Sequence, residues 1–179
     1  MNGSRRIGDI ELLRGLAVLG ILIHHAQGNL LAWTTPAMDR FYAYFNIGHT
    51  IDLFFAISGF VIARDLIPKV QEVGKDRVSF FRLAIAFWIR RAYRLLPSAW
   101  VCLACIVLLS LLFNQSNAFG SVRANFAGAV AAVLQVANMH FAFNLQSGLG
   151  LGATFPFWSL SFAEQFYLAL PLMLFFSGR

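Results

Sequence analysis

The sequence contains little charge. Of its 179 residues, 14 are Lys or Arg and 8 are Asp or Glu, a charged share of 12% that is about half the share found in soluble domains. Hydrophobic residues make up 59% of the chain, and Phe alone occurs 19 times. This composition excludes an ordinary soluble domain and predicts an integral membrane protein.

Cysteine is nearly absent. The two cysteines, Cys102 and Cys105, have the C-x-x-C spacing of some redox pairs. However, they lie in a continuous apolar run, with no preceding strand and no cationic neighbour to activate a thiol. The sequence therefore predicts two small, buried packing residues. It also lacks zinc-type Cys/His spacing and a Gly-rich phosphate loop, so we predict neither a bound metal nor nucleotide hydrolysis.

The positive charge is concentrated in one part of the chain. The net charge is +6, and eight of the 14 Lys and Arg residues lie between Arg64 and Arg94. Arg5 and Arg6 precede the first apolar run. By the positive-inside rule, the N-terminus and residues 64–94 are cytoplasmic, and residues 33–46 lie outside. Charge placed beside apolar segments reports membrane orientation, so we predict no nucleic-acid partner.

Apolar segments predict the fold class, an all-α polytopic bundle of transmembrane helices. A spanning helix needs about 20 mainly apolar residues. The basic stretch before the third segment mixes aromatics with arginines, which predicts an interfacial helix that turns into the third span near Pro97. If successive spans cross the membrane in alternating directions, residues 146–154 are cytoplasmic. The alternative is that they form a re-entrant segment. The five predicted spans are residues 12–32, 47–67, 95–113, 125–143 and 157–176.

One pair of residues in the first span indicates a functional interior. Arg14 and His25 lie eleven positions apart, so at about 100° per residue they share a helix face, roughly 16 Å apart along the axis. His24 points about 100° away from that face. Ionisable residues inside a membrane are costly and usually face a wet, functional cavity. The residues alone also allow His25 to be a core histidine bonded to a backbone carbonyl.

Two acidic residues in other predicted spans are candidate site residues. Asp52, near the outer end of the second span, lies at a depth similar to that of His25. It is a candidate to orient the imidazole, and the alternative is an interfacial cap on its own helix. Glu164 is an acid inside the fifth span, where such a residue is functional by default.

Four motifs occur in one order along the chain. Together they resemble the acyltransferase-3 family of bacterial membrane enzymes, which acylate lipopolysaccharide O-antigen, other exopolysaccharides and macrolides. The resemblance covers nearly the whole chain. The motifs are DIELLRGLA (Asp9–Ala17) leading to His25, IDLFFAISGF (Ile51–Phe60), FWIRRAYRLLP (Phe87–Pro97) and WSLSFAEQFY (Trp158–Tyr167).

The resemblance implies an activity and roles for the first pair. The family carries an Arg/Lys-x10-His motif, matched here by Arg14 and His25. It implies an O-acyltransferase of the bacterial inner membrane that moves an acyl group, often acetyl, from cytoplasmic acyl-CoA to a hydroxyl of a carbohydrate or lipid-linked glycan. His25 is then the catalytic base, and acyl-CoA is a co-substrate with no tightly bound cofactor. Arg14 either holds the donor phosphate or carbonyl, or anchors the helix by snorkelling.

The other two motifs imply further site residues. Arg90, Arg91 and Arg94 resemble the basic R-x-x-R element of the family, and guanidinium groups suit coenzyme A phosphates; the alternative is ordinary positive-inside charge. In the last motif, Ala163 stands where family members commonly carry Glu, which leaves Glu164 as the acid of the fifth span.

Two readings compete with this enzyme. In a membrane transport or binding module, His25, Asp52 and Glu164 would form a proton relay. The family fold has about ten spanning helices, so we expect the chain to be the N-terminal half of such a protein, and an inactive truncated relic is the other alternative.

Overall fold

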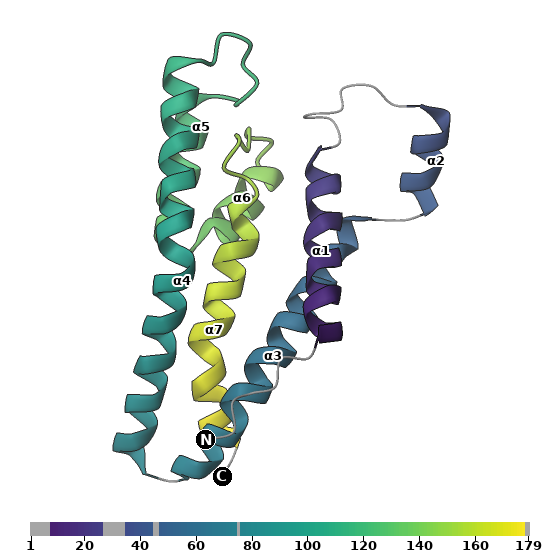
Figure 1. Ribbon diagram of the computed structural model, residues 1–179. Helices are drawn as coiled ribbons and strands as arrows, with labels where there is room; N and C mark the ends of the chain where they lie inside the picture. The colour runs from purple at the N-terminus through teal and green to yellow at the C-terminus, as the bar shows by residue number, and fades with distance from the viewer. Residues whose placement is uncertain (1–7, 27–34, 45–46, 75, 178–179) are drawn as a thin grey trace. The chain divides into compact units, whose positions relative to one another are not determined.

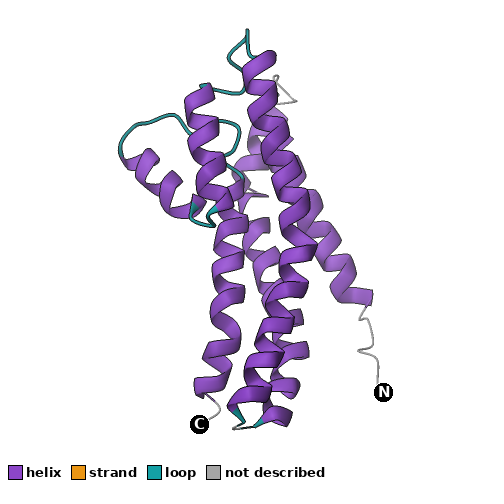
Figure 2. Ribbon diagram, turned by 90° about the vertical axis from the view of Figure 1, so that its left-hand side faces the viewer, coloured by secondary structure: helices purple, strands orange, loops and turns teal. Residues whose placement is uncertain are grey.

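The computed structural model of the protein describes residues 8–26, 35–44, 47–74 and 76–177. These residues form helices and loops and contain no strand (Figure 2), which confirms the predicted all-α class. The chain divides into two compact units, Met1–Pro68 and Lys69–Arg179. The elements are α1 (Gly8–Ala26), α2 (Pro36–Tyr44), the 3-10 helix η1 (Ile47–His49), α3 (Thr50–Val73), α4 (Arg77–Leu112), α5 (Val122–Val133), α6 (Ala137–Gln146) and α7 (Phe157–Ser177).

In the first unit, α1 packs against η1 and the start of α3. The approach is close at Gly20, where an added Cβ would lie 2.5 Å from Cγ2 of Thr50. Glycine is therefore required there, because any side chain would push the two helices apart. This contact places the half of α1 that carries His25 beside the start of α3.

The helix bounds in this unit differ from the predicted ones. The first span was predicted as 12–32, whereas α1 begins at Gly8 and ends at Ala26, with residues 27–32 outside the described residues. The second, predicted as 47–67, becomes η1 followed by an α3 that continues to Val73. The predicted outer loop contains the helix α2. Arg5 and Arg6, which carry part of the orientation argument, also lie outside the described residues.

In the second unit, α4 is one continuous helix of 36 residues. The third span was predicted as 95–113, with an interfacial helix that turns into it near Pro97, and in the structure both parts belong to this one helix. Pro97 lies inside α4, where a proline removes the hydrogen bond to the carbonyl four residues earlier and its ring crowds that carbonyl. The helix-forming residues on both sides keep the axis continuous.

Asp76 caps the start of α4. Its carboxylate accepts hydrogen bonds from the backbone N–H groups of Val78 and Ser79, both at 3.2 Å. Hydrogen bonds from the side chain and backbone of Ser79 hold the pKa of Asp76 below its ordinary value. The carboxylate at this terminus also complements the positive end of the helix dipole.

The fourth span was predicted as one helix over 125–143, and this was also wrong. The chain instead forms α5 and α6, of 12 and 10 residues, with Gln135 between them at φ 59°. At 1.5 Å per residue these helices are about 18 and 15 Å long. Each is too short to cross the roughly 30 Å hydrocarbon core.

Helices α5 and α6 form a hairpin that begins and ends at the same end of the unit. The loop before α5 and the loop after α6 are joined by a backbone hydrogen bond from Ala153 N–H to Phe119 O, at 3.1 Å. The buried Asn125 fastens both loops: its Nδ2 donates to Phe119 O at 2.8 Å, and its Oδ1 accepts from Ala153 N–H at 2.7 Å. Figure 1 shows both loops at the upper end of the unit.

Helix α7 runs antiparallel to α4, as Figure 1 shows. The rings of Phe80 and Phe175 stack with centroids 4.2 Å apart, which places the end of α7 beside the start of α4. Of the described helices, α4 and α7 are the two that are both long and apolar enough to cross a bilayer. Any 18-residue stretch of α1 or α3 contains at least three charged residues. The structure therefore has two candidate spans where the sequence predicted five.

The core of this unit lies between the C-terminal half of α4 and the hairpin of α5 and α6. One buried hydrophobic cluster joins Leu103 of α4 to Ala131, Ala132, Ala137 and Phe141 of the hairpin. Small residues on α5 let the helices approach closely, as in membrane bundles. Cys102 and Cys105 are both exposed, so the prediction that they are buried was wrong. The two cysteines lie on the exposed surface of α4, whereas Leu103, between them in the sequence, faces this core.

The hairpin changes the expected membrane topology. If the basic start of α4 is cytoplasmic, the Gly-rich loop after α6 lies outside and the end of α7 lies inside, opposite to simple alternation. We expect a Gly150→Cys variant to react with an impermeant maleimide added to intact cells. A Ser177→Cys variant should react only after permeabilisation, because it lies at the end of α7.

The control for this labelling is the parent protein with Cys102→Ala and Cys105→Ala, which should show no signal. Protection of Gly150→Cys together with labelling of Ser177→Cys in intact cells would restore the alternating topology.

Candidate active site

The first unit carries the Arg14 and His25 pair. Both residues lie on the uninterrupted helix α1, so the shared face expected from their spacing is present. Arg14 is half-buried and His25 is exposed. The ring of His24 meets the ring of His25 edge-on, with centroids 5.6 Å apart. The catalytic role of His25 stays a prediction.

Asp52 has an imidazole partner that the sequence argument did not foresee. Its Oδ2 lies 3.0 Å from Nδ1 of His49, and both side chains are more than 70% exposed (71% and 74%). The three-residue spacing of His49 and Asp52 was the available sequence signal for this contact, because η1 leads directly into the first turn of α3. The orientation of His25 by Asp52 stays a prediction, supported by the packing of Gly20 on Thr50.

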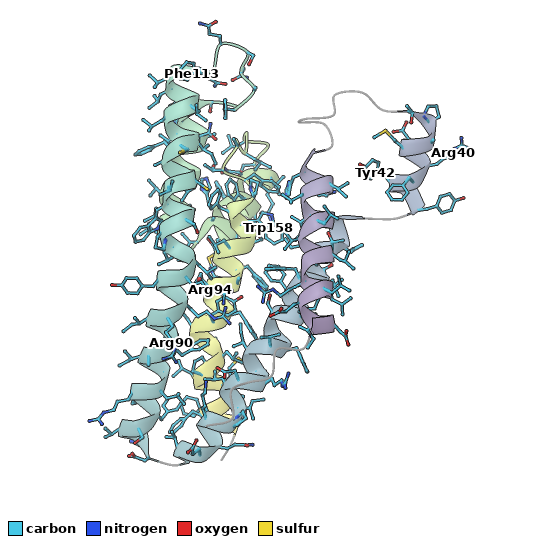
Figure 3. All side chains as sticks on the ribbon, viewed as in Figure 1. Arg40, Tyr42, Arg90, Arg94, Phe113 and Trp158 are labelled. Atoms are coloured by element: carbon cyan, nitrogen blue, oxygen red, sulfur yellow. The ribbon has the colours of Figure 1, made fainter. Side chains whose placement is uncertain are left out.

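The three arginines predicted to bind the donor do not form one group. Arg90 and Arg94, labelled on α4 in Figure 3, are exposed and lie one turn apart. Arg91 is half-buried and faces α7, with its guanidinium carbon 4.9 Å from the ring centroid of Tyr167 and 5.9 Å from that of Phe87. The geometry thus separates two arginines available to a ligand from one held within the unit.

Glu164 lies in the interior of the second unit. It is 9% exposed, and its Oε1 has no hydrogen-bond partner. Ala163, at the position where the family commonly has Glu, is also buried. The remaining acid of the motif therefore lies inside the second unit.

The next residue of α7 faces the hairpin. Gln165 and Asn138 exchange two side-chain hydrogen bonds of 3.0 Å, and Gln165 Nε2 also donates to Gln135 O at 2.8 Å. Sequence reasoning missed this cluster. It follows from the break between α5 and α6, because the interrupted backbone leaves polar groups that must find partners away from water.

A third contact fixes α7 against α4. Trp88 Nε1 donates to the backbone carbonyl of Tyr167 at 3.2 Å. Pro171, four residues later, has no N–H to donate to that carbonyl. The indole N–H therefore replaces the missing helical donor to the carbonyl of Tyr167, the residue whose ring lies over Arg91.

Comparison with known proteins identifies the family of the chain. The model of the family described as "Acyltransferase domain" matches residues 7–179. The chain is 31% identical over 174 residues to "Putative peptidoglycan O-acetyltransferase YrhL" of Bacillus subtilis, covering 95% of this chain and 24% of that protein. It is 29% identical over 173 residues to "Peptidoglycan O-acetyltransferase OatA" of Listeria monocytogenes, covering 94% of this chain and 24% of that protein.

The chain thus spans about a quarter of the length of these curated relatives. No solved structure matches it. The two apolar helices and the family together make it a membrane protein. Since the family model covers nearly all of the sequence, the chain belongs to the acyltransferase domain family that its four motifs predicted.

Proposed function

We propose that this chain is part of an O-acetyltransferase of the bacterial cytoplasmic membrane that moves an acetyl group from acetyl-CoA to a hydroxyl of a cell-wall glycan. The observation that carries this proposal is the family match over residues 7–179, together with relatives named for peptidoglycan O-acetylation. Peptidoglycan replaces the lipopolysaccharide and exopolysaccharide acceptors that the sequence motifs suggested.

The chemistry assigned to the first unit is general base catalysis. Neutral His25 takes the proton of the acceptor hydroxyl as its oxygen attacks the thioester carbonyl, because an imidazole titrates near neutral pH. The new ester forms, the carbon–sulfur bond breaks, and the proton passes from His25 to the departing thiolate of coenzyme A. Arg14, on the same helix face, holds the donor phosphate or carbonyl.

Donor phosphates are assigned to the exposed pair on α4. Arg90 and Arg94 lie one turn apart at the basic, cytoplasmic part of the chain, where a soluble thioester arrives. Two guanidinium groups on one face can each form bidentate bonds to phosphate oxygens. Arg91 is left out of this set because it faces Tyr167 on α7.

The proposal is tested with the full-length gene product reconstituted in lipid vesicles. Supplied with acetyl-labelled acetyl-CoA and muropeptides, it should produce glycan that carries the label as an alkali-labile ester. An empty-vesicle control should produce none. Proton uptake into the vesicles without any acetylated glycan would instead favour the transport module, in which His25, Asp52 and Glu164 relay protons.

A further inference from the structure

One side of α7 supplies polar partners to the break between α5 and α6. Trp158, Ser161 and Gln165 are three and then four residues apart, so they lie on the same side of the helix. All three belong to the fourth sequence motif, and the proposed mechanism uses none of them. Trp158 packs against the apolar cluster of α4 and the hairpin. Ser161 and Gln165 form hydrogen bonds with residues 135–138.

The break releases backbone groups that a continuous helix would pair. In such a helix Ala137 N–H would donate to the carbonyl four residues earlier, and Gln135 O would accept from Met139 N–H. Met139 N–H instead donates to Val136 O at 3.1 Å. One donor and one acceptor of the main chain therefore need other partners, because leaving them unpaired away from water is costly.

Both partners come from α7. Ser161 Oγ accepts from Ala137 N–H at 3.3 Å, and Gln165 Nε2 donates to Gln135 O at 2.8 Å. Gln165 also exchanges two side-chain hydrogen bonds with Asn138, the second residue of α6. Ala137 and Ser161 are 0% and 1% exposed, so the first of these bonds lies away from solvent. Helix α7 thus completes the hydrogen bonding on each side of the break.

The local sequence does not by itself favour a break. Gln135 has φ 59°, a left-handed backbone conformation that residues other than glycine rarely adopt. Residues 122–146 contain one charged residue, Arg123. As a continuous helix they would be about 37 Å long, enough to cross the hydrocarbon core. Contacts with the rest of the unit therefore decide between a hairpin and a spanning helix.

We propose that Ser161 and Gln165 are positioning residues that keep α5 and α6 a hairpin. By binding the released groups of the break, they prevent a spanning helix and return the Gly-rich loop to the end of the unit where the chain enters α5. The loop then stays on the outer side, where the acceptor glycan arrives. This link to acyl transfer rests on the proposed function, whereas the hairpin contacts do not depend on it.

The first test measures the separation of the two ends of the hairpin in the full-length protein. Ala118→Cys and Ala153→Cys are introduced together in a background with Cys102→Ala and Cys105→Ala. A short bismaleimide should link the pair in this parent protein, because Ala153 N–H donates to the carbonyl of Phe119. In a spanning helix the two cysteines would be more than about 30 Å apart, beyond the reach of the reagent. Peptide mass spectrometry gives the ratio of linked to unlinked protein.

Variants of α7 are then compared by this ratio. Gln165→Leu removes three hydrogen bonds and should lower the ratio about 10- to 30-fold. Ser161→Ala removes one and should lower it about threefold. Gln146→Leu, at an exposed residue at the end of α6, is the matched control and should have little effect. Acetyl transfer should fall together with the linked fraction.

A rescue experiment separates a role at the break from general packing of α7. Gln135→Gly favours the positive φ and disfavours a continuous helix. Added to Gln165→Leu, it should restore most of the linking and most of the acetyl transfer. A packing defect elsewhere on α7 would not respond to a glycine in the hairpin.

The linking ratios decide the proposal. Unchanged linking in Gln165→Leu would overturn it, as would absence of linking in the parent protein or a loss that Gln135→Gly does not correct. If Gln165→Leu does not insert, Ser161→Ala decides, and a ratio equal to that of the parent would count against the proposal. If the parent protein transfers no acetyl group, the proposed function fails, and the ratios still show whether α7 holds the hairpin.

Discussion

Replacing His25 by alanine in the full-length protein should lower the rate of acetyl transfer by a factor of about 10² to 10⁴, the usual loss when a general base is removed. Expression, membrane insertion and acetyl-CoA binding should stay near those of the parent protein, because the imidazole acts on the proton of the acceptor. The exposed position of His25 on α1 makes a large folding defect unexpected. Initial rates and donor affinity are measured on the same purified sample.

The controls for His25 lie on the same helix. His24→Ala, about 100° around the helix, should have a mild effect, and Arg14→Lys should retain more activity than Arg14→Ala because the family motif accepts either cation. Losses in both histidine variants that follow the amount of folded protein would make His25 a structural residue. Full activity in a well-folded His25→Ala protein would remove the catalytic assignment.

Replacing Arg90 or Arg94 by alanine should raise the dissociation constant for acetyl-CoA by about 10- to 100-fold. Each substitution removes a charge-assisted hydrogen bond to a phosphate, with a loss of roughly 1.5–3 kcal/mol. Lysine should restore affinity only in part, because it lacks the planar fork of arginine. Isothermal titration of the purified variants with acetyl-CoA measures the effect.

Arg91→Ala is the comparison for this pair. It should lower kcat and leave the dissociation constant unchanged, since its guanidinium faces Tyr167 on α7. Unchanged donor affinity in both Arg90→Ala and Arg94→Ala, with normal insertion, would return these residues to ordinary positive-inside charge.

The sequence was sufficient for the fold class and the family. Apolar composition predicts membrane helices, and four spaced motifs predict the family that the comparison confirms. The break at Gln135 was not predictable, because residues on both sides of it are apolar and hydropathy averages across the turn. Gln135 has a positive φ at this break, and its carbonyl accepts a hydrogen bond from Gln165, 30 positions away in the sequence.

The partners of the site residues were harder still to predict. Arg91 and Tyr167 are 76 positions apart, and nothing in either local sequence indicates that the guanidinium group meets the ring. Cys102 and Cys105 illustrate a second limit: in a membrane, apolar residues are favourable on lipid-facing and interior surfaces alike. Hydropathy therefore cannot distinguish a buried thiol from an exposed one. The structure can, because it shows which face of α4 packs on α5.

The most direct test of the account is the sidedness of acetyl transfer. We propose that the donor binds inside, where the positive-inside rule predicts the basic clusters, and that the cell-wall acceptor lies outside. Membrane vesicles of opposite orientation are loaded with muropeptides and given labelled acetyl-CoA externally, which does not cross the bilayer. We predict labelled glycan in the lumen of inside-out vesicles and none in right-side-out vesicles. Labelling in right-side-out vesicles, with inside-out vesicles inactive, would contradict the account.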